Sequence, residues 1–441
     1  MKNDSRTKIV TIKLRSIAVG GDSVGEVNAV QNTELDSDLL GITAFVPYGV
    51  PGEEILAEVI ENKKTFLRAK LLEVVTESLD REVAPCPYYQ NCGGCEIQHI
   101  DYRAQVEFKK AMVLGALRSA KFTSQILDLV PDLIKSEPFN YRRRINLHVD
   151  RRGSVGFYQS GSRTIVPIKE CLIASKELQN AITNVHLIGP DLAGRINSIH
   201  IEEGEGKILA VLSAPYELNS TERKDIINVA RKVFSNIIIN SAGKEICSEG
   251  QTSFKLHLNK SKSVYVRIPG GGFSQVNWEV NLKLIESVTN FFREENPARI
   301  MDLYGGAGNF SIPLAKDGFD ILGVETDKKL VALARETAKE QGFLKKFHFE
   351  ENSVNKFLKH KKFSLAENIG IIADPPRSGL GELAKDVSFA KQIVLVSCHL
   401  PSFVRDLKAL LELGYQVKKI ELYDMFPQTT YLESVVFLYK E

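Results

Sequence analysis

The chain has 441 residues, which is long enough for two or three domains. Its hydrophobic fraction of 43% and charged fraction of 25% are typical of a globular chain, and no apolar run approaches the roughly 18 residues that a membrane span needs. The formal net charge of +2 does not by itself indicate a nucleic-acid binder. The opening MKNDSRTK lacks the apolar core of a signal peptide, so a cytoplasmic location is expected.

The N-terminal region, residues 1–76, is predicted to be a small β-barrel. Five short strands are expected within residues 8–76, separated by turn signals such as Gly20-Gly21 and Pro51-Gly52. Short strands at this spacing are typical of OB-like barrels and related all-β modules.

Residues 77–270 are predicted to form a mixed α+β central domain. A Pro-, Gly- and Cys-rich segment at 81–99 is unsuited to regular structure, and a helix is expected at about 102–120. Despite its place in the sequence, that helix is a candidate to pack on the C-terminal domain. Between residues 140 and 275, strands and helices are expected to mix irregularly.

Residues 271–441 show a regular alternation of helices and strands, with helices expected at 277–293 and about 401–413. Repeated βα units predict an α/β domain with a parallel, doubly wound, Rossmann-like sheet. The last two strands, 415–426 and 432–440, follow each other directly and predict an antiparallel final hairpin.

A glycine-rich turn, DLYGGAGN at 302–309, ends one predicted strand and opens a helix. Glycines there let a ligand approach the backbone closely. Glu325 ends the next strand, about twenty residues on, where an acid can bind ribose hydroxyls. A dinucleotide site or an empty tight turn would show the same pattern.

Asp374-Pro375-Pro376 follows a later strand and forms a rigid turn at the carboxyl edge of the sheet. This turn favours a base-modifying methyltransferase that uses S-adenosylmethionine. Arg377 follows the proline pair, where enzymes that methylate amines usually have an aromatic residue. That difference leaves carbon methylation open.

Cys398 lies between a predicted strand and a predicted helix. Uracil carbon 5 is a poor nucleophile, and adding a thiolate to carbon 6 turns carbon 5 into a carbanion equivalent. A base must then remove the carbon-5 proton, and Glu433, at the start of an apolar strand, is the candidate. The alternative for Cys398 is a buried core thiol. The alternative for Glu433 is a solvated residue at the end of a strand.

Three of the six cysteines fall within ten residues, as Cys86-x5-Cys92-x2-Cys95, and Cys171 is the natural fourth ligand. In a reducing compartment such clusters more often hold metal than form disulfides. Four thiolates suit zinc or an iron–sulfur cluster, and the spacing does not decide between them. Cys247 stands apart and is predicted to be a core residue.

Basic residues gather at Tyr141-Arg142-Arg143-Arg144 and at Arg151-Arg152. Basic side chains beside an aromatic ring suit phosphate contacts and base stacking, although such a run is also typical of a solvated face. A uracil in folded RNA would have to be flipped out before a thiol could reach it.

These motifs together resemble the RNA uracil-5 methyltransferase family along nearly the whole chain. The likeness is carried, in order, by GGFSQVNW, DLYGGAGNFSIPLA, GVE, EEN, DPPRSG, VSCHLPSFVRDL and MFPQTTYLESVVFL. The N-terminal barrel resembles a TRAM domain, an RNA-binding module, through GEVNAV, FVPYGVPGE and KKTFLRAKLLEV. Two positions depart from the family: His399-Leu400 replaces the common Asn-Pro, and Gly305 replaces Cys or Ser.

The resemblance implies S-adenosylmethionine-dependent methylation of uracil carbon 5 in RNA. Cys398 would be the nucleophile, Glu433 the base, and Asp374 a catalytic residue near the target base. The S-adenosylmethionine site would comprise Gln275, Tyr304, Asn309, Glu325, Asn352 and Asp374. The resemblance also implies a structural [4Fe-4S] cluster held by Cys86, Cys92, Cys95 and Cys171.

The RNA partner is expected to be 23S ribosomal RNA, because barrel and cluster occur together in the family members that act on it. tRNA is the alternative substrate, and the chain is expected to be a monomer with no membrane partner. A rival class is an RNA-binding protein with an inactive methyltransferase domain, which the presence of both Cys398 and Glu433 disfavours. A cytosine-5 enzyme would carry a second cysteine where Arg377 and Ser378 stand.

Overall fold

The computed structural model describes residues 8–31, 37–360 and 368–441, so the opening segment used to judge a signal peptide lies almost wholly outside it. The described chain forms two compact units. Unit 1 comprises residues 1–115 and 426–431, and unit 2 comprises residues 116–425 and 432–441. The boundaries of the three domains expected from the sequence remain predictions.

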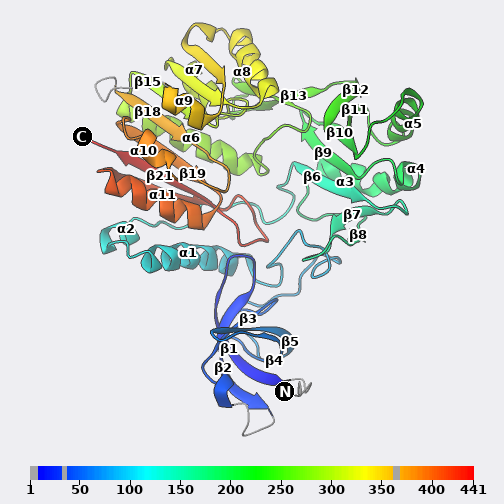
Figure 1. Ribbon diagram of the computed structural model, residues 1–441, viewed down its shortest axis with the longest axis vertical. Helices are drawn as coiled ribbons and strands as arrows, with labels where there is room; N and C mark the ends of the chain where they lie inside the picture. The colour runs from blue at the N-terminus through cyan, green and yellow to red at the C-terminus, as the bar shows by residue number, and fades with distance from the viewer. Residues whose placement is uncertain (1–7, 32–36, 361–367) are drawn as a thin grey trace. The chain divides into compact units, whose positions relative to one another are not determined.

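The N-terminal part of unit 1 consists of five strands closed into a barrel in the order β1-β2-β3-β5-β4 (Figure 1). The strands are β1 (Ile9–Ile17), β2 (Ser23–Gln31), β3 (Thr43–Val46), β4 (Glu54–Asn62) and β5 (Phe66–Thr76). Alternate side chains of β1, among them Val10, Ile12 and Leu14, fill the barrel interior, as the period of two in a strand requires.

The barrel is tied to the irregular segment that follows it. Arg81 donates to both oxygens of the fully buried Glu53, at 2.5 and 2.8 Å, and to the Tyr48 carbonyl at 2.9 Å. Helix α1 (Tyr102–Ser119) begins in unit 1 and confirms the helix predicted at 102–120.

Unit 2 contains a first seven-stranded sheet in the order β12-β11-β10-β9-β6-β7-β8. Its strands are β6 (Arg144–Val149), β7 (Val155–Tyr158), β8 (Ile165–Pro167), β9 (Ser198–Gly204), β10 (Lys207–Ala214), β11 (Asn236–Ser241) and β12 (Lys244–Glu249). The helices of this region are α2 (Ser124–Asp128), α3 (Lys176–Asn184), α4 (Gly189–Leu192) and α5 (Ser220–Ala230).

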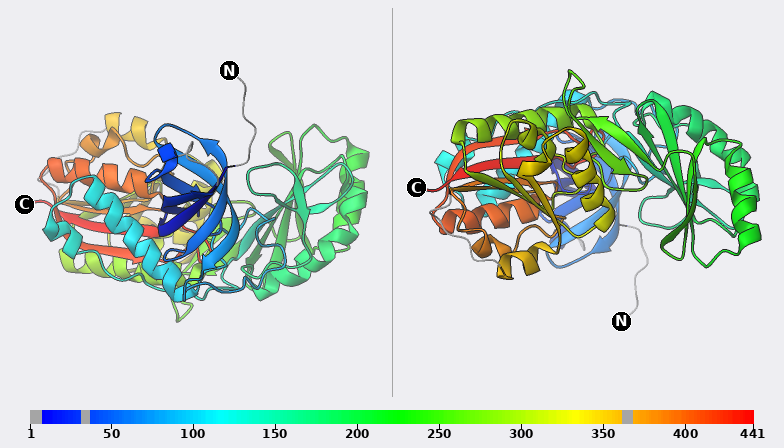
Figure 2. Two further views of the ribbon diagram at one scale, coloured as in Figure 1. Left: turned by 90° about the horizontal axis from the view of Figure 1, so that it is seen from below. Right: turned by 90° about the horizontal axis from the view of Figure 1, so that it is seen from above.

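The second seven-stranded sheet of unit 2 has the order β17-β16-β15-β18-β19-β21-β20. Its last two strands in sequence, coloured red, lie side by side (Figure 2). Its strands are β15 (Arg299–Leu303), β16 (Ile321–Glu325), β17 (Phe347–Glu351), β18 (Ile369–Ala373), β19 (Gln392–Ser397), β20 (Gln416–Tyr423) and β21 (Glu433–Tyr439). Strands β15 to β19 are parallel, and β21 is antiparallel to both β19 and β20. The predicted parallel sheet and antiparallel final hairpin are confirmed.

Helices connect the strands of this second sheet. They are α6 (Trp278–Glu295), α7 (Ser311–Lys316), α8 (Lys328–Glu340), α9 (Val354–His360), α10 (Leu383–Asp386) and α11 (Leu400–Glu412). A hairpin of β13 (Ser253–His257) and β14 (Tyr265–Pro269) precedes α6. Within the described ranges, every helix is too short or too polar to cross a lipid bilayer.

Strand order reverses between β15 and β18, and ligands of open α/β sheets bind at the carboxyl ends of strands beside such a reversal. A ligand is therefore expected to bind at the carboxyl ends of β15, β16, β18 and β19.

Candidate active site

The proposed catalytic residues all lie at one edge of the second sheet. Asp374 directly follows β18, and Cys398 directly follows β19. Glu433 is the first residue of β21, whose antiparallel pairing with β19 sets Ser434 opposite Ser397. The sheet thus brings the start of β21 to the carboxyl end of β19.

A pocket opens at this edge beside the glycine-rich turn. Four of the six predicted S-adenosylmethionine residues line it: Gln275, Tyr304, Asn309 and Asp374. Tyr304 has a left-handed backbone (φ 65°), a strained conformation for a residue with a side chain and one often found at ligand sites. A Cβ at Gly305 would lie 3.0 Å from the Phe349 ring, which explains why the smallest residue fits here.

The other two predicted residues, Glu325 and Asn352, lie beside the glycine-rich turn and not among the residues that line the pocket. The Glu325 carboxylate accepts hydrogen bonds from the backbone N–H groups of Gly306 at 3.0 Å and Asp327 at 2.9 Å. The Asn352 N–H donates to the Glu325 carbonyl at 2.9 Å. Glu325 therefore links the turn to the end of β16.

Asp302 is a buried carboxyl group that the sequence analysis did not single out. Its Oδ2 accepts from the Ser311 hydroxyl at 2.5 Å, whereas Oδ1 has no hydrogen-bond partner among the described residues. Burial raises the pKa of Asp302 to about 7. Its position near the end of a buried strand, just before the glycine-rich turn, was the available sequence signal. Because it lines the pocket, its unpaired oxygen suits a ligand donor.

Asp374 and Glu433 are buried carboxyl groups that influence each other. Burial, and then the charge of Asp302, raises the pKa of Asp374 above its usual range. Burial, and then the charge of Asp374, raises the pKa of Glu433 well above its usual range. Gln275 donates to Asp374 at 3.4 Å, and Oε1 of Glu433 has no hydrogen-bond partner among the described residues. A raised pKa suits a group that must accept a proton from carbon.

The Cys398 thiol is half-buried, and its pKa is raised to about 11. Burial is the largest cause, followed by the negative charges of Glu433 and Asp374, while Arg377 acts in the opposite direction. The thiol is therefore protonated at neutral pH, and its reactivity depends on losing that proton.

The unusual His399-Leu400 pair has a clear structural setting. His399 Nδ1 lies 2.8 Å from the Ser402 hydroxyl, and that hydroxyl donates to the Arg377 carbonyl at 2.9 Å. Next along α11, the buried Asp406 accepts from the Leu380 N–H at 2.6 Å. These bonds join the loop of the nucleophile to the turn that follows β18.

The four predicted metal-ligating cysteines are divided between the units: Cys86, Cys92 and Cys95 lie in unit 1, and Cys171 lies in unit 2. Among the residues that the structure describes, no group of three or more His, Cys, Asp or Glu side chains is arranged to hold a metal ion. Cys247 is only partly buried on β12 at the sheet edge, so its prediction as a core residue was wrong.

Two arginines of the predicted RNA-contacting run have a role in the fold. Arg143 donates to the Glu203 carbonyl at 3.0 Å, and its guanidinium lies 5.6 Å from the centre of the Trp278 ring. Arg144 donates to the Gly272 carbonyl at 3.3 Å and lies 4.9 Å from the centre of the Phe273 ring. Both therefore brace the segment that forms one wall of the pocket.

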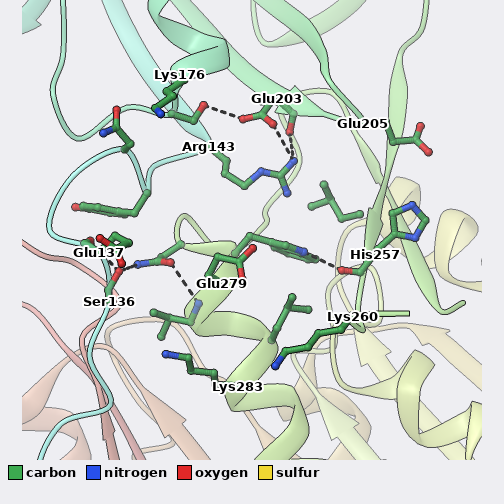
Figure 3. Close-up of a pocket in the computed structure, with 18 of the residues that line it drawn as sticks. Ser136, Glu137, Arg143, Lys176, Glu203, Glu205, His257, Lys260, Glu279 and Lys283 are labelled. Atoms are coloured by element: carbon green, nitrogen blue, oxygen red, sulfur yellow. Dashed lines mark hydrogen bonds and ion pairs between the residues drawn. The ribbon is translucent and has the colours of Figure 1, made fainter. Parts of the chain in front are cut away.

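A second cavity of unit 2, of about 1090 Å³, lies around the start of α6 (Figure 3). Its lysines outnumber its acids: the basic residues are Lys135, Arg143, Lys176, Lys255, Lys260, Lys262 and Lys283, and the acids are Glu137, Glu203, Glu205 and Glu279. Arg143 forms an ion pair with Glu203. The lysines outnumber the other glutamates, so the side chains that line this cavity carry a net positive charge.

The sheet order, the glycine-rich turn at the strand reversal and the Asp-Pro-Pro turn define a methyltransferase-type catalytic unit. Comparison with known proteins gives the family. The family model described as tRNA (Uracil-5-)-methyltransferase matches residues 101–441. The chain therefore belongs to this family and is an RNA uracil-C5 methyltransferase, as the sequence motifs predicted.

Individual relatives agree with this assignment. The chain is 31% identical over 408 residues to the 23S rRNA (uracil(1939)-C(5))-methyltransferase RlmD of Shewanella woodyi, with 90% of each chain covered. It is 32% identical over 410 residues to the RlmD of Shewanella sp. strain MR-7, again with 90% of each covered.

A solved structure covers nearly the whole fold. The crystal structure of Pyrococcus abyssi tRNA (uracil-54, C5)-methyltransferase in complex with S-adenosyl-L-homocysteine has a TM-score of 0.74 and 25% identity. The match covers 97% of this chain and 99% of that one.

Proposed function

We propose that this enzyme methylates carbon 5 of a specific uridine in 23S ribosomal RNA through a covalent adduct between Cys398 and uracil carbon 6. The observation that carries the proposal is the convergence of Cys398, Glu433 and Asp374 at one sheet edge, next to a pocket at the strand reversal. The RlmD names of the relatives support the ribosomal substrate.

S-adenosylmethionine is the proposed co-substrate, and it supplies a methyl group made electrophilic by its sulfonium sulfur. The residues proposed to hold it are Gln275, Tyr304, Asn309, Glu325, Asn352 and Asp374. The pocket lining, the unpaired buried Oδ1 of Asp302 and the S-adenosyl-L-homocysteine named for the Pyrococcus abyssi enzyme support this choice.

The reaction begins when Cys398 loses its proton to solvent and the thiolate adds to uracil carbon 6. The S–C6 bond forms, and the C5=C6 electron pair moves into an enolate. Carbon 5 then attacks the methyl group, so that a C–C bond forms and S-adenosylhomocysteine leaves. Glu433 takes the carbon-5 proton, the C5=C6 double bond returns and the C6–S bond breaks.

RNA has to present a flipped uracil to this site. The lysine-lined cavity around α6 is proposed to contact RNA phosphates, and the barrel of residues 1–76 is proposed to act as a TRAM-like RNA-binding module. The proposed organisation is a barrel (1–76), a central domain (77–270) and a catalytic domain (271–441), acting as a monomer in the cytoplasm.

The [4Fe-4S] cluster on Cys86, Cys92, Cys95 and Cys171 is also a proposal, and its support is the chemistry of the donor set. Four thiolates are the usual ligands of such a cluster, which would stabilise the loops that carry them. The segment that carries the first three cysteines forms a hydrogen-bonded turn, since the N–H of Tyr89 donates to the Cys86 carbonyl at 3.1 Å. Aerobically purified protein is expected to be brown with about four irons per chain; colourless zinc protein would refute the assignment.

tRNA is the second candidate substrate, because the structurally similar Pyrococcus abyssi enzyme is named for it. The deciding experiment incubates the enzyme and labelled S-adenosylmethionine with ribosomal RNA and with tRNA from cells that lack the gene. Labelled 5-methyluridine in 23S RNA is expected, and mapping gives its position. Label only in tRNA would refute the ribosomal substrate, and no label in uridine of either RNA would refute the proposed function.

A further inference from the structure

The loop that leads into Glu433 belongs to unit 1, although Glu433 itself belongs to unit 2. The chain leaves unit 2 after Met425, residues Phe426–Tyr431 form part of unit 1, and unit 2 resumes at Leu432. Only Leu432 separates this loop from the proposed base. We call residues 426–431 the base-leading loop.

One side of the base-leading loop is bound by the cysteine segment. Oε2 of Glu96, the residue after Cys95, accepts from the Thr430 N–H at 3.0 Å and from the Thr430 hydroxyl at 2.7 Å. In return, the N–H groups of Glu96 and Ile97 donate to the Gln428 carbonyl at 2.9 and 3.2 Å. The N–H of Gly20, at the β1–β2 turn, also donates to the Thr430 hydroxyl at 3.0 Å.

The other side of the base-leading loop is bound by α1. The buried side chains of Gln105 and Gln428 meet at 2.9 Å, and the Gln428 N–H donates to Oε1 of Gln105 at 3.1 Å. The ammonium group of Lys109, which is 1% exposed, donates to the Phe426 carbonyl at 3.1 Å. Gln428 has a left-handed backbone (φ 68°), which costs free energy and persists because these bonds fix it.

The position of Glu433 depends on the sheet pairing that follows it and on the backbone that precedes it. Glu433 is the first residue of β21, where the pairing of this strand with Tyr423 of β20 ends. Its Oε1 makes no hydrogen bond with any described residue. No side-chain partner therefore fixes the direction of this oxygen. A shift of the base-leading loop would therefore move the carboxyl group away from the carbon-5 proton, and small displacements strongly slow proton transfer.

We propose that Glu96 and Gln105 are positioning residues for the base: they fix the base-leading loop and so set where the Glu433 carboxyl group lies. This inference rests on the proposed function. It assigns the cysteine segment a role in catalysis, because Glu96 directly follows Cys95. The step affected is the last one, in which the carbon-5 proton leaves and the C6–S bond breaks.

The test uses Glu96→Ala and Gln105→Leu, with Glu96→Gln as the conservative variant and Glu107→Ala on the exposed face of α1 as the matched control. Each full-length protein is assayed for kcat, for KM of both substrates and for a methyl-labelled protein–RNA adduct that survives denaturation. Adduct should accumulate in Glu96→Ala and Gln105→Leu, because methyl transfer outruns elimination. Their kcat should fall by about tenfold or more, part of the 10²–10⁴ that a general base supplies, with KM within about twofold of wild type.

The control and Glu96→Gln should release product as wild type does, since a carboxamide oxygen can still accept from Thr430. Wild-type turnover without adduct in both Glu96→Ala and Gln105→Leu would overturn the inference. So would a uniform loss of methylation and melting temperature without adduct, because that result is expected of a purely structural role. If either variant fails to fold, Thr430→Val, which removes the hydroxyl that binds Glu96, provides the same readout. Absence of 5-methyluridine with wild-type enzyme would instead refute the proposed function.

Discussion

Ser397 of β19 and Ser434 of β21 lie opposite each other in an antiparallel pair. Cys398 follows the first serine and Glu433 precedes the second, so one rung of the sheet accounts for the proximity of the proposed nucleophile and base. Both strands are buried along this edge, which explains why the pKa values of the two groups are raised.

Replacement of Cys398 by alanine should abolish 5-methyluridine formation, because the sequence has no other cysteine after residue 247. The loss should exceed about a thousandfold, as for removal of a covalent nucleophile. Cys247→Ala is the matched control, since Cys247 lies on β12 of the other sheet and should leave the rate unchanged. Methyl incorporation from labelled S-adenosylmethionine measures both, and equal labelling by Cys398→Ala would exclude the covalent mechanism.

Alkylation of Cys398 in the free enzyme should become faster as pH rises. Its pKa is about 11, so the thiolate fraction should grow about tenfold per pH unit between pH 7 and 10. Arg377→Leu should slow alkylation at any given pH, because removing the positive charge raises the pKa further. Site-resolved mass spectrometry with iodoacetamide measures these rates. An alkylation rate that stops rising by pH 8 would show instead that the pKa of the thiol is lowered.

Asp302 should make the free energy of unfolding fall as pH rises from about 4 to 7. The folded pKa of Asp302, about 7, lies above its unfolded value, so the folded state binds more protons between about pH 4 and 7. Deprotonation in that window therefore favours unfolding, by at most about 1.4 kcal/mol per pH unit for this group. Urea unfolding from pH 5 to 8 should show a shallower decline in Asp302→Asn than in wild type. An identical slope would contradict the assignment.

Asp406 should stabilise the loop that follows β18. Its buried carboxylate accepts from the backbone N–H groups of Leu380 at 2.6 Å and Gly381 at 3.1 Å, so Asp406→Ala leaves two donors without their partner. The expected loss in unfolding free energy is about 1–3 kcal/mol. Denaturant titration measures it, with the exposed Asp386→Ala on α10 as control. Equal stability of the two variants would rule out this role.

The lysines around α6 should contribute to RNA affinity through phosphate contacts. Lys260→Ala combined with Lys283→Ala should weaken RNA binding and reduce the slope of log affinity against log salt by about one to two, because fewer counterions are released. Binding titrations at several salt concentrations measure the slope. The exposed Lys408→Ala on α11 provides the control. An unchanged salt slope in the double variant would exclude the cavity from RNA contact.

The sequence by itself determined the features that local pattern encodes. Strand and helix alternation followed from the periodicity of apolar residues, and the antiparallel final hairpin followed from two consecutive strands with no helix between them. The glycine-rich turn and the Asp374-Pro375-Pro376 turn could be placed at one sheet edge because parallel strands share their carboxyl ends. Cys398 and Glu433 were identifiable because the family motif surrounds each of them.

The tertiary structure decided what depends on distant residues. Burial raises the pKa of Asp302, and the charge of Asp302 in turn raises the pKa of Asp374; a local pattern reveals neither effect. In the sequence, Arg143 and Arg144 resemble a run of exposed basic residues. In the structure, Arg143 contacts Glu203 and the Trp278 ring, and Arg144 contacts the Phe273 ring. Likewise, the base-leading loop follows β20 in sequence, yet its partners lie more than 300 residues earlier. Such long-range hydrogen bonds and desolvation arise only when the chain closes on itself.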